Sequence, residues 1–235
     1  MTTSCSFRSL TCAVAAWACL AVTAQAEVVV SNLYLTNTIA DYVSSSEWVA
    51  QSFTTNNQAW TIASATLSFI TASDSSGNLF IDVYSNGTNS PGTSLGPLSG
   101  SSNPAATGEY TYTSTGINLD PSTTYWLVAG VSSGSGYYHW IYDASETTPP
   151  PSLGVWSIPS INTYADSVDG GSSWEVWNLE PFLFSVEATA AGPPIVPEID
   201  PATGSGAISL VAGVLAMIEQ RRRRGVAAGL AGRAS

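Results

Sequence analysis

Short runs rich in Val, Ile, Thr, Tyr, Trp and Phe alternate with clusters of Gly, Pro, Asn and Ser from Glu27 to Ala190. This pattern is typical of β-strands joined by turns, and no stretch in it has a sustained helical period. The candidate strands are EVVVSNLYL, WVAQSFTT, WTIASATLSFI, NLFIDVYS, GEYTYTS, TTYWLVAGV, YYHWIYD, LGVWSI, SWEVWNL and PFLFSVEA. They predict an all-β fold, an antiparallel β-sandwich of jelly-roll type. A parallel β-solenoid is the second alternative, but no internal period repeats.

Alternation within two runs predicts core side chains. Side chains alternate between the two faces of a strand, so Phe182, Phe184 and Val186 share one face. Leu79, Ile81 and Val83 share a face in the same way. We expect both faces to be core. The stretch from 86 to 108 carries Pro91, Pro97 and Pro104, which argue against a central strand there and favour a long loop.

Charge is distributed unevenly along the chain. All six basic residues lie before Glu27 or after Val196, whereas fourteen of the seventeen acidic residues lie between Glu27 and Glu187. A surface with only negative formal charge repels phosphate backbones, so nucleic acid is a poor partner. Divalent cations or neutral sugars suit such a surface better.

The first 26 residues have the features of a secretory signal peptide. Arg8 precedes an apolar run from Leu10 to Val22, and Ala24 and Ala26 form a small-x-small cleavage site. Lipidation at Cys19 is the weaker alternative, because the bulky Trp17 stands two residues before it. All three cysteines lie inside this leader, so the mature chain has no thiol and no disulfide.

The chain beyond the β domain divides into three parts. A linker covers residues 191–203. The uncharged run from Gly204 to Ile218 follows it and predicts a transmembrane helix over 204–220. Its core of about fifteen residues would be near 22 Å long as a helix, which is short for a bilayer core of about 30 Å. Arg221, Arg222, Arg223 and Arg224 begin a basic tail, 221–235, that we expect in the cytoplasm.

The motif, the short span and the basic cluster together resemble a PEP-CTERM sorting signal. The motif consists of Val196, Pro197, Glu198, Ile199, Asp200 and Pro201, and Ile199 stands where a second proline is usual. The resemblance implies recognition by an exosortase, a membrane peptidase associated with exopolysaccharide-producing bacteria. It also implies that the precursor is held in the inner membrane during sorting.

A second resemblance covers the β domain from Val43 to Ala188. QSFTT at Gln51–Thr55, DVYSNGTNSPGTSLGPLSG at Asp82–Gly100, and the pair GEYTYTS and LDPSTTYWLVAGV resemble the choice-of-anchor R domain. This is a bacterial surface domain named for its occurrence with different cell-envelope anchors. It implies an extracellular β domain of unknown biochemical activity and supplies no catalytic residues.

Catalytic residues are weakly indicated. GTSLG places Ser94 in a G-x-S-x-G pattern, but a proline turn precedes it and no helix follows, as a nucleophile elbow requires. His139 is the only histidine and therefore the only imidazole base for such a serine. A glycosidase would need two carboxylates at a defined separation, for which Asp82, Glu109, Glu175 and Glu180 are available. Acids scattered on strand edges more often keep a surface soluble, so we expect no enzyme.

Two binding features leave alternatives open. Tyr138, Trp140 and Tyr142 share one strand face. This face could be an exposed glycan platform or part of the core, and core is favoured because large aromatic side chains are usually buried. The sequence has further indoles at Trp126, Trp156, Trp174 and Trp177. Asp166, Asp169 and Glu175 lie in and beside a Gly-rich turn. They are weak calcium candidates, because the ordered calcium loop is missing and a plain hairpin explains the same residues. No other cofactor is indicated.

The sequence therefore predicts an exported cell-envelope or extracellular-matrix protein, non-enzymatic and associated with exopolysaccharide. Signal peptidase and exosortase are its expected processing partners. A carbohydrate-binding module or a polysaccharide-acting hydrolase is the alternative.

Overall fold

The computed structural model describes residues 25–36, 39–71, 76–145 and 147–192. These residues form strands and no helix, and so contain no helical segment suited to crossing a membrane. The strands are β1 (Glu27–Ser31), β2 (Ala40–Val43), β3 (Trp48–Thr54), β4 (Trp60–Thr71), β5 (Leu79–Asn86), β6 (Pro91–Leu98), β7 (Gly108–Leu119), β8 (Thr124–Val131), β9 (Tyr138–Ile141), β10 (Tyr164–Ser167), β11 (Glu175–Trp177) and β12 (Phe184–Ala190). The predicted leader up to Ala24 and all of the chain from 193 onward lie outside the described residues.

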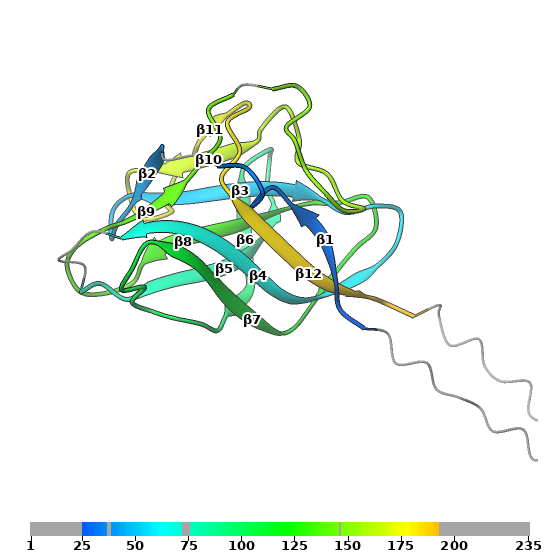
Figure 1. The fold of residues 1–235 in the computed structure, drawn as a ribbon, viewed down its shortest axis with the longest axis horizontal. Coiled ribbons are helices and arrows are strands. Elements are labelled where there is room, and N and C mark those ends of the chain that lie inside the picture. The colour runs from blue at the N-terminus through cyan, green and yellow to red at the C-terminus, as the bar shows by residue number, and fades with distance from the viewer. Residues whose placement is uncertain (1–24, 37–38, 72–75, 146, 193–235) are drawn as a thin grey trace, which may run out of the picture. The chain divides into compact units, whose positions relative to one another are not determined.

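Two antiparallel sheets make up the described domain (Figure 1). Sheet A has the order β1-β12-β4-β9-β2, with β7 on the other side of β4, and sheet B has the order β11-β10-β3-β8-β5-β6. Consecutive strands mostly lie in opposite sheets, as they do in a sandwich. The all-β prediction is confirmed and the two sheets are consistent with a β-sandwich; the jelly-roll type stays a prediction.

Strand β4 organises sheet A. Its residues Trp60 to Leu67 pair with β12, and Phe69 to Thr71 pair with β9, so two strands follow each other along one side of it. Strand β7 pairs with the opposite side through Gly108 to Thr113 and Ile117 to Leu119, with an irregularity between them. An isolated bridge between Tyr142 and Phe182 joins the ends of β9 and β12. This arrangement places β9, and β2 beside it, at one end of the sheet.

The core lies between the sheets, and the alternation seen in the sequence determines much of it. Phe182, Phe184 and Val186 are buried, and so are Leu79, Ile81 and Val83, as predicted. Leu183 on the other face of its strand is buried as well. A second, smaller cluster on the outer face of sheet B contains Ala50, Trp126, Val128 and Ala165, with Trp48, Phe80, Tyr84, Trp174 and Val176 packed against it.

Three strands were missed by the sequence pattern, namely β2, β6 and β10. The prediction of a long loop over 86–108 is wrong in part, because Pro91–Leu98 form β6. This strand is at the edge of sheet B, where proline is tolerated because its missing N–H faces no neighbour. Conversely, the candidate strand LGVWSI forms only isolated bridges, from Leu153 to Ser31 and from Ser157 to Thr54.

Candidate functional site

Two of the three residues of the possible glycan platform lie in the core, which is the alternative that the sequence favoured. Tyr138 and Trp140 are both 0% exposed. The Tyr138 hydroxyl donates to the Gly77 carbonyl oxygen at 2.6 Å, and Trp140 Nε1 donates to the Leu183 carbonyl oxygen at 2.9 Å. Tyr142 is half-buried, with its ring against Phe182. The core alternative is correct, because neither Tyr138 nor Trp140 presents a ring face to a ligand.

The opposite face of the same segment carries exposed rings. Tyr42 on β2 pairs with His139 on β9, and Tyr137 precedes β9 on that face. The ring centroids are 4.5 Å apart for Tyr42 and His139, 5.0 Å for Tyr137 and His139, and 5.1 Å for Tyr42 and Tyr137. We call these three side chains the ring ledge. Tyr42 is 49% and Tyr137 41% exposed, so the ledge is accessible from solvent.

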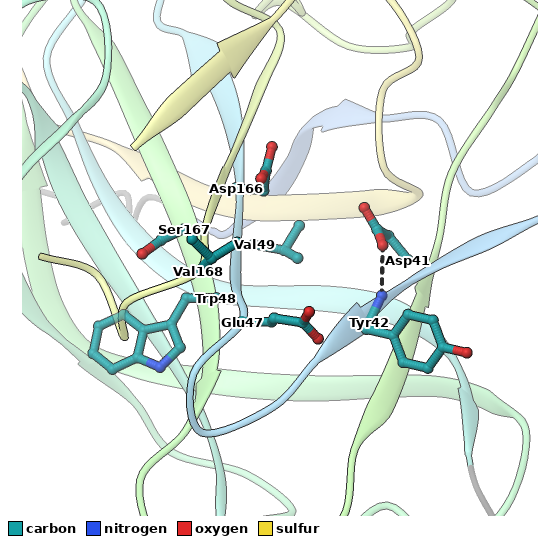
Figure 2. A pocket seen from close by; sticks show the side chains of 8 residues that line it. All are labelled: Asp41, Tyr42, Glu47, Trp48, Val49, Asp166, Ser167 and Val168. Carbon is teal, nitrogen blue, oxygen red and sulfur yellow. Dashed lines mark hydrogen bonds between the residues drawn. The ribbon is translucent and has the colours of Figure 1, made fainter. Parts of the chain in front are cut away.

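A small pocket lies on the other side of β2 from the ring ledge; Tyr42 is among its lining residues, but the Tyr42 ring points away from the other lining side chains (Figure 2). It is lined by Asp41 and Tyr42 from β2, by Glu47, Trp48 and Val49 at the start of β3, and by Asp166, Ser167 and Val168 from β10 and just beyond it. Because β2 belongs to sheet A whereas β3 and β10 belong to sheet B, the pocket opens at the lateral edge between the sheets. Its volume is about 70 Å³. A few water molecules or one substituent of a ligand would fill it.

Negative charge concentrates around this pocket. Asp41, Glu47 and Asp166 all line it (Figure 2). Burial raises the pKa of the nearby Tyr164 hydroxyl, and the charges of Glu180, Asp166 and Asp41 raise it further. Two of these carboxylates already accept hydrogen bonds: Asp41 from the backbone N–H of Tyr42 at 2.8 Å, and Asp166 from Trp177 Nε1. The pocket therefore offers acceptor oxygens to hydroxyl or amine donors.

The three calcium candidates have different surroundings and hydrogen-bond partners. Asp166 lines the pocket, whereas Glu175 is exposed on β11, opposite Asp166 in the ladder. Asp169 accepts hydrogen bonds from the Ser167 hydroxyl at 2.8 Å, the Ser173 N–H at 2.8 Å and the Ser173 hydroxyl at 2.6 Å. The bonds from Ser173 and Ser167 lower the pKa of Asp169 to about 2. Within the described segments, no three His, Cys, Asp or Glu side chains form a group suited to a metal ion. Asp169 stabilises its own turn.

Ser94 is not at a nucleophile elbow. It lies in the edge strand β6 and its hydroxyl donates to Asp82 Oδ2 at 2.9 Å, while His139 lies in the other sheet. Burial raises the pKa of Asp82, and the hydrogen bond from Ser94 partly offsets that effect. The strand–turn–helix context that activates a serine is therefore missing at this position.

Two of the four candidate acids are too far apart for glycosidic chemistry. Asp82 on β5 and Glu175 on β11 are separated by four strand spacings in sheet B, or about 19 Å. Glycosidases hold their two carboxylates about 5 to 9.5 Å apart. Glu109 is exposed on β7 of the other sheet, and Glu180 precedes β12 near Tyr142 and Tyr164.

The remaining indoles have separate roles. Trp126 and Trp156 are buried, Trp174 is half-buried on the outer cluster of sheet B, and Trp177 is 43% exposed with its Nε1 bonded to Asp166. Sequence reasoning missed the ring ledge, because the segment from Tyr137 to Tyr142 has aromatic side chains on both faces. The partner ring, Tyr42, lies in a strand that the pattern did not predict.

Comparison with known proteins identifies the C-terminal segment. Residues 196–225 match the family model of the VPEID-CTERM protein sorting domain, whereas no curated protein matches the chain. The five residues that give this family its name, Val-Pro-Glu-Ile-Asp, are present as Val196 to Asp200. Ile199 therefore belongs to the motif of this variant signal. The resemblance of the β domain to choice-of-anchor R stays a prediction. The chain carries a VPEID-CTERM protein sorting domain at residues 196–225, a PEP-CTERM-like C-terminal signal of the exosortase type.

Proposed function

We propose that this chain is a non-enzymatic protein of the cell envelope or extracellular matrix, processed by an exosortase and associated with exopolysaccharide. The sorting domain marks an exported, sorted surface protein. The observation that carries the proposal is the position of the signal: its match begins at Val196, six residues after β12 ends at Ala190. A folded β domain is thus followed closely by the sequence that a sorting enzyme reads.

The expected order of processing follows from the three parts of the tail. Signal peptidase removes the leader after Ala26, and the predicted transmembrane helix 204–220 then holds the precursor in the inner membrane. Arg221 to Arg224 stay on the cytoplasmic side, because clusters of basic residues are retained there. Pro197 and Glu198 are then presented on the outer side, where the exosortase cuts.

The non-enzymatic part of the proposal is supported by the geometry of the β domain. Asp82 and Glu175 are too widely separated for a glycosidase pair, and Ser94 is in an edge strand. Release of sugar from exopolysaccharide by the purified protein, abolished by replacing one acid, would overturn this part.

The sorting part is tested by C-terminal mass spectrometry of protein from envelope and medium. In a host with its exosortase, we expect the major form to lack peptides from Gly204 onward. Deletion of the exosortase, or Glu198→Ala, should leave an uncleaved membrane-bound form. Glu187→Ala is the matched control, since Glu187 is exposed on β12 outside the motif. Persistence of residues 221–235 in the major wild-type form would show that the protein is simply membrane-anchored.

A further inference from the structure

We propose that the ring ledge and the adjoining pocket form a binding site for one chain of a neutral polysaccharide. The inference deepens the proposed association with exopolysaccharide, because it names the surface and the class of polymer. It does not depend on the sorting reaction, which concerns residues outside the β domain.

Two of the three rings of the ledge are exposed, and the third, His139, is half-buried. Large aromatic side chains are normally buried, yet Tyr42 and Tyr137 are 49% and 41% exposed while in contact with each other and with His139. The outer face of sheet A elsewhere carries polar pairs, such as Thr66 with Thr111 and Thr61 with Asn118. Val28 on β1 is also exposed on this sheet, but it is not part of the ledge. A cluster of exposed rings in mutual contact is typical of an interaction surface.

The side chains near the rings match the chemistry of a sugar. Sugar rings present apolar C–H faces and hydroxyl donors around their rims. The ledge supplies ring faces with polar tips on the outer face of sheet A. Asp41 pairs with the core residue Trp140, so it lies on the opposite side of the edge strand β2 from the Tyr42 ring. There Asp41 and Glu47 line the pocket and supply acceptor oxygens around the edge from the ledge. The pocket can receive one substituent of a sugar and cannot enclose a whole ligand, because its volume is only about 70 Å³. This geometry suits a polymer lying across the surface.

The negative charge of the β domain limits which class of polymer can bind. The sequence has no Lys or Arg between Glu27 and Val196, so the β domain has no fixed cation to pair with uronate, sulfate or phosphate groups. Asp41, Glu47, Asp166 and Glu180 make the local potential negative. A polyanion would be repelled, and a neutral polymer avoids this cost while still donating its hydroxyls.

The location also makes the site accessible to a long chain. Strand β2 is the last strand of sheet A, and the pocket opens where β2 faces β3 and β10 of sheet B. A polymer can therefore run along the edge of the sandwich without threading through a tunnel.

The test is affinity electrophoresis of the full chain, solubilised in mild detergent, in native gels. The gels contain hydroxyethylcellulose or galactomannan as neutral polymers, alginate as a polyanion, or chitosan as a polycation. We expect the neutral gels to retard the wild type. Tyr42→Ala and His139→Ala should weaken binding about tenfold, or about 1.4 kcal/mol. Tyr42→Phe should bind nearly as wild type, because it keeps the ring.

Tyr34→Ala is the matched control, because Tyr34 is 50% exposed but lies outside the ledge. It should leave retardation unchanged, and all variants should keep the wild-type melting temperature. No retardation in either neutral gel overturns the proposal, as does equal binding by Tyr42→Ala. Retardation by chitosan alone, abolished by salt, would instead indicate a cation site. A dimer in sedimentation that Tyr42→Ala disperses, without retardation, would show that the ledge binds a second copy.

This result is separable from the sorting proposal. Loss of polysaccharide binding leaves the mass-spectrometric test of cleavage unaffected, and an uncleaved tail leaves the electrophoresis of the full chain interpretable.

Discussion

Trp140 and His139 are neighbours in β9 with opposite environments. Trp140 is fully buried, lies 4.9 Å from the ring of Phe182 and 6.2 Å from that of Phe69 between centroids, and donates its Nε1–H to Leu183. Trp140→Ala should therefore lower the free energy of unfolding by about 3 to 5 kcal/mol, measured by urea titration. His139→Ala removes a partly exposed ring and should change it by less than about 1 kcal/mol. Equal effects of the two changes would contradict the assignment of the faces.

At the scale of elements, the edge of β1 is covered by the segment from Leu153 to Trp156. Ser31 N–H donates to the Leu153 carbonyl oxygen at 2.9 Å, and Trp156 N–H donates to the Val29 carbonyl oxygen at 2.8 Å. This cover satisfies backbone groups that an edge strand would otherwise present to another chain. Gly154 makes the close approach possible, because a Cβ there would lie 2.2 Å from the Val29 carbonyl oxygen.

Gly154→Ala should push this segment away from β1. The steric contact should lower the free energy of unfolding by about 1 to 3 kcal/mol, in addition to the loss caused by placing alanine at a positive φ. Gly116→Ala is a matched control, because its φ of 107° is close to the 108° of Gly154 while its Cβ would meet only Thr61 Cγ2 at 3.9 Å. Urea titration gives both values, and hydrogen exchange at the Ser31 N–H reports the detachment. If the two alanine variants lose equal stability, the contact with Val29 does not limit this position.

The whole β domain has a one-sided charge, with fourteen Asp and Glu residues and no Lys or Arg from Glu27 to Glu187. Mutual repulsion opposes compaction, and salt screens it as the Debye length falls from about 30 Å at 0.01 M to about 10 Å at 0.1 M. The isolated segment 27–190 should therefore melt a few degrees higher in 0.2 M than in 0.01 M NaCl. The same scan in sucrose controls for solute effects that do not involve charge. A melting temperature that falls with salt would show that attractive contacts dominate the electrostatics.

Several features of this protein could be read from the sequence because they are local. The sorting signal is a linear motif, so its residues suffice to predict a PEP-CTERM-like signal, and the match of residues 196–225 to the VPEID-CTERM family model supports that prediction. The alternation from Leu79 to Val83 likewise predicts a buried face, since the period of a strand is a property of the backbone.

Only the tertiary structure decided which face of Tyr137 to Tyr142 is exposed. Both faces carry aromatic rings, so a period of two cannot distinguish them, and the choice depends on how β9 pairs with β4 and β2. The pocket shows the same limit, because Asp41 lies in sheet A, Asp166 lies in sheet B more than a hundred residues later in the chain, and Glu47 directly precedes β3 of sheet B. The sorting signal was determined by adjacent residues, whereas the candidate binding site exists only because pairing between distant strands brings its side chains together.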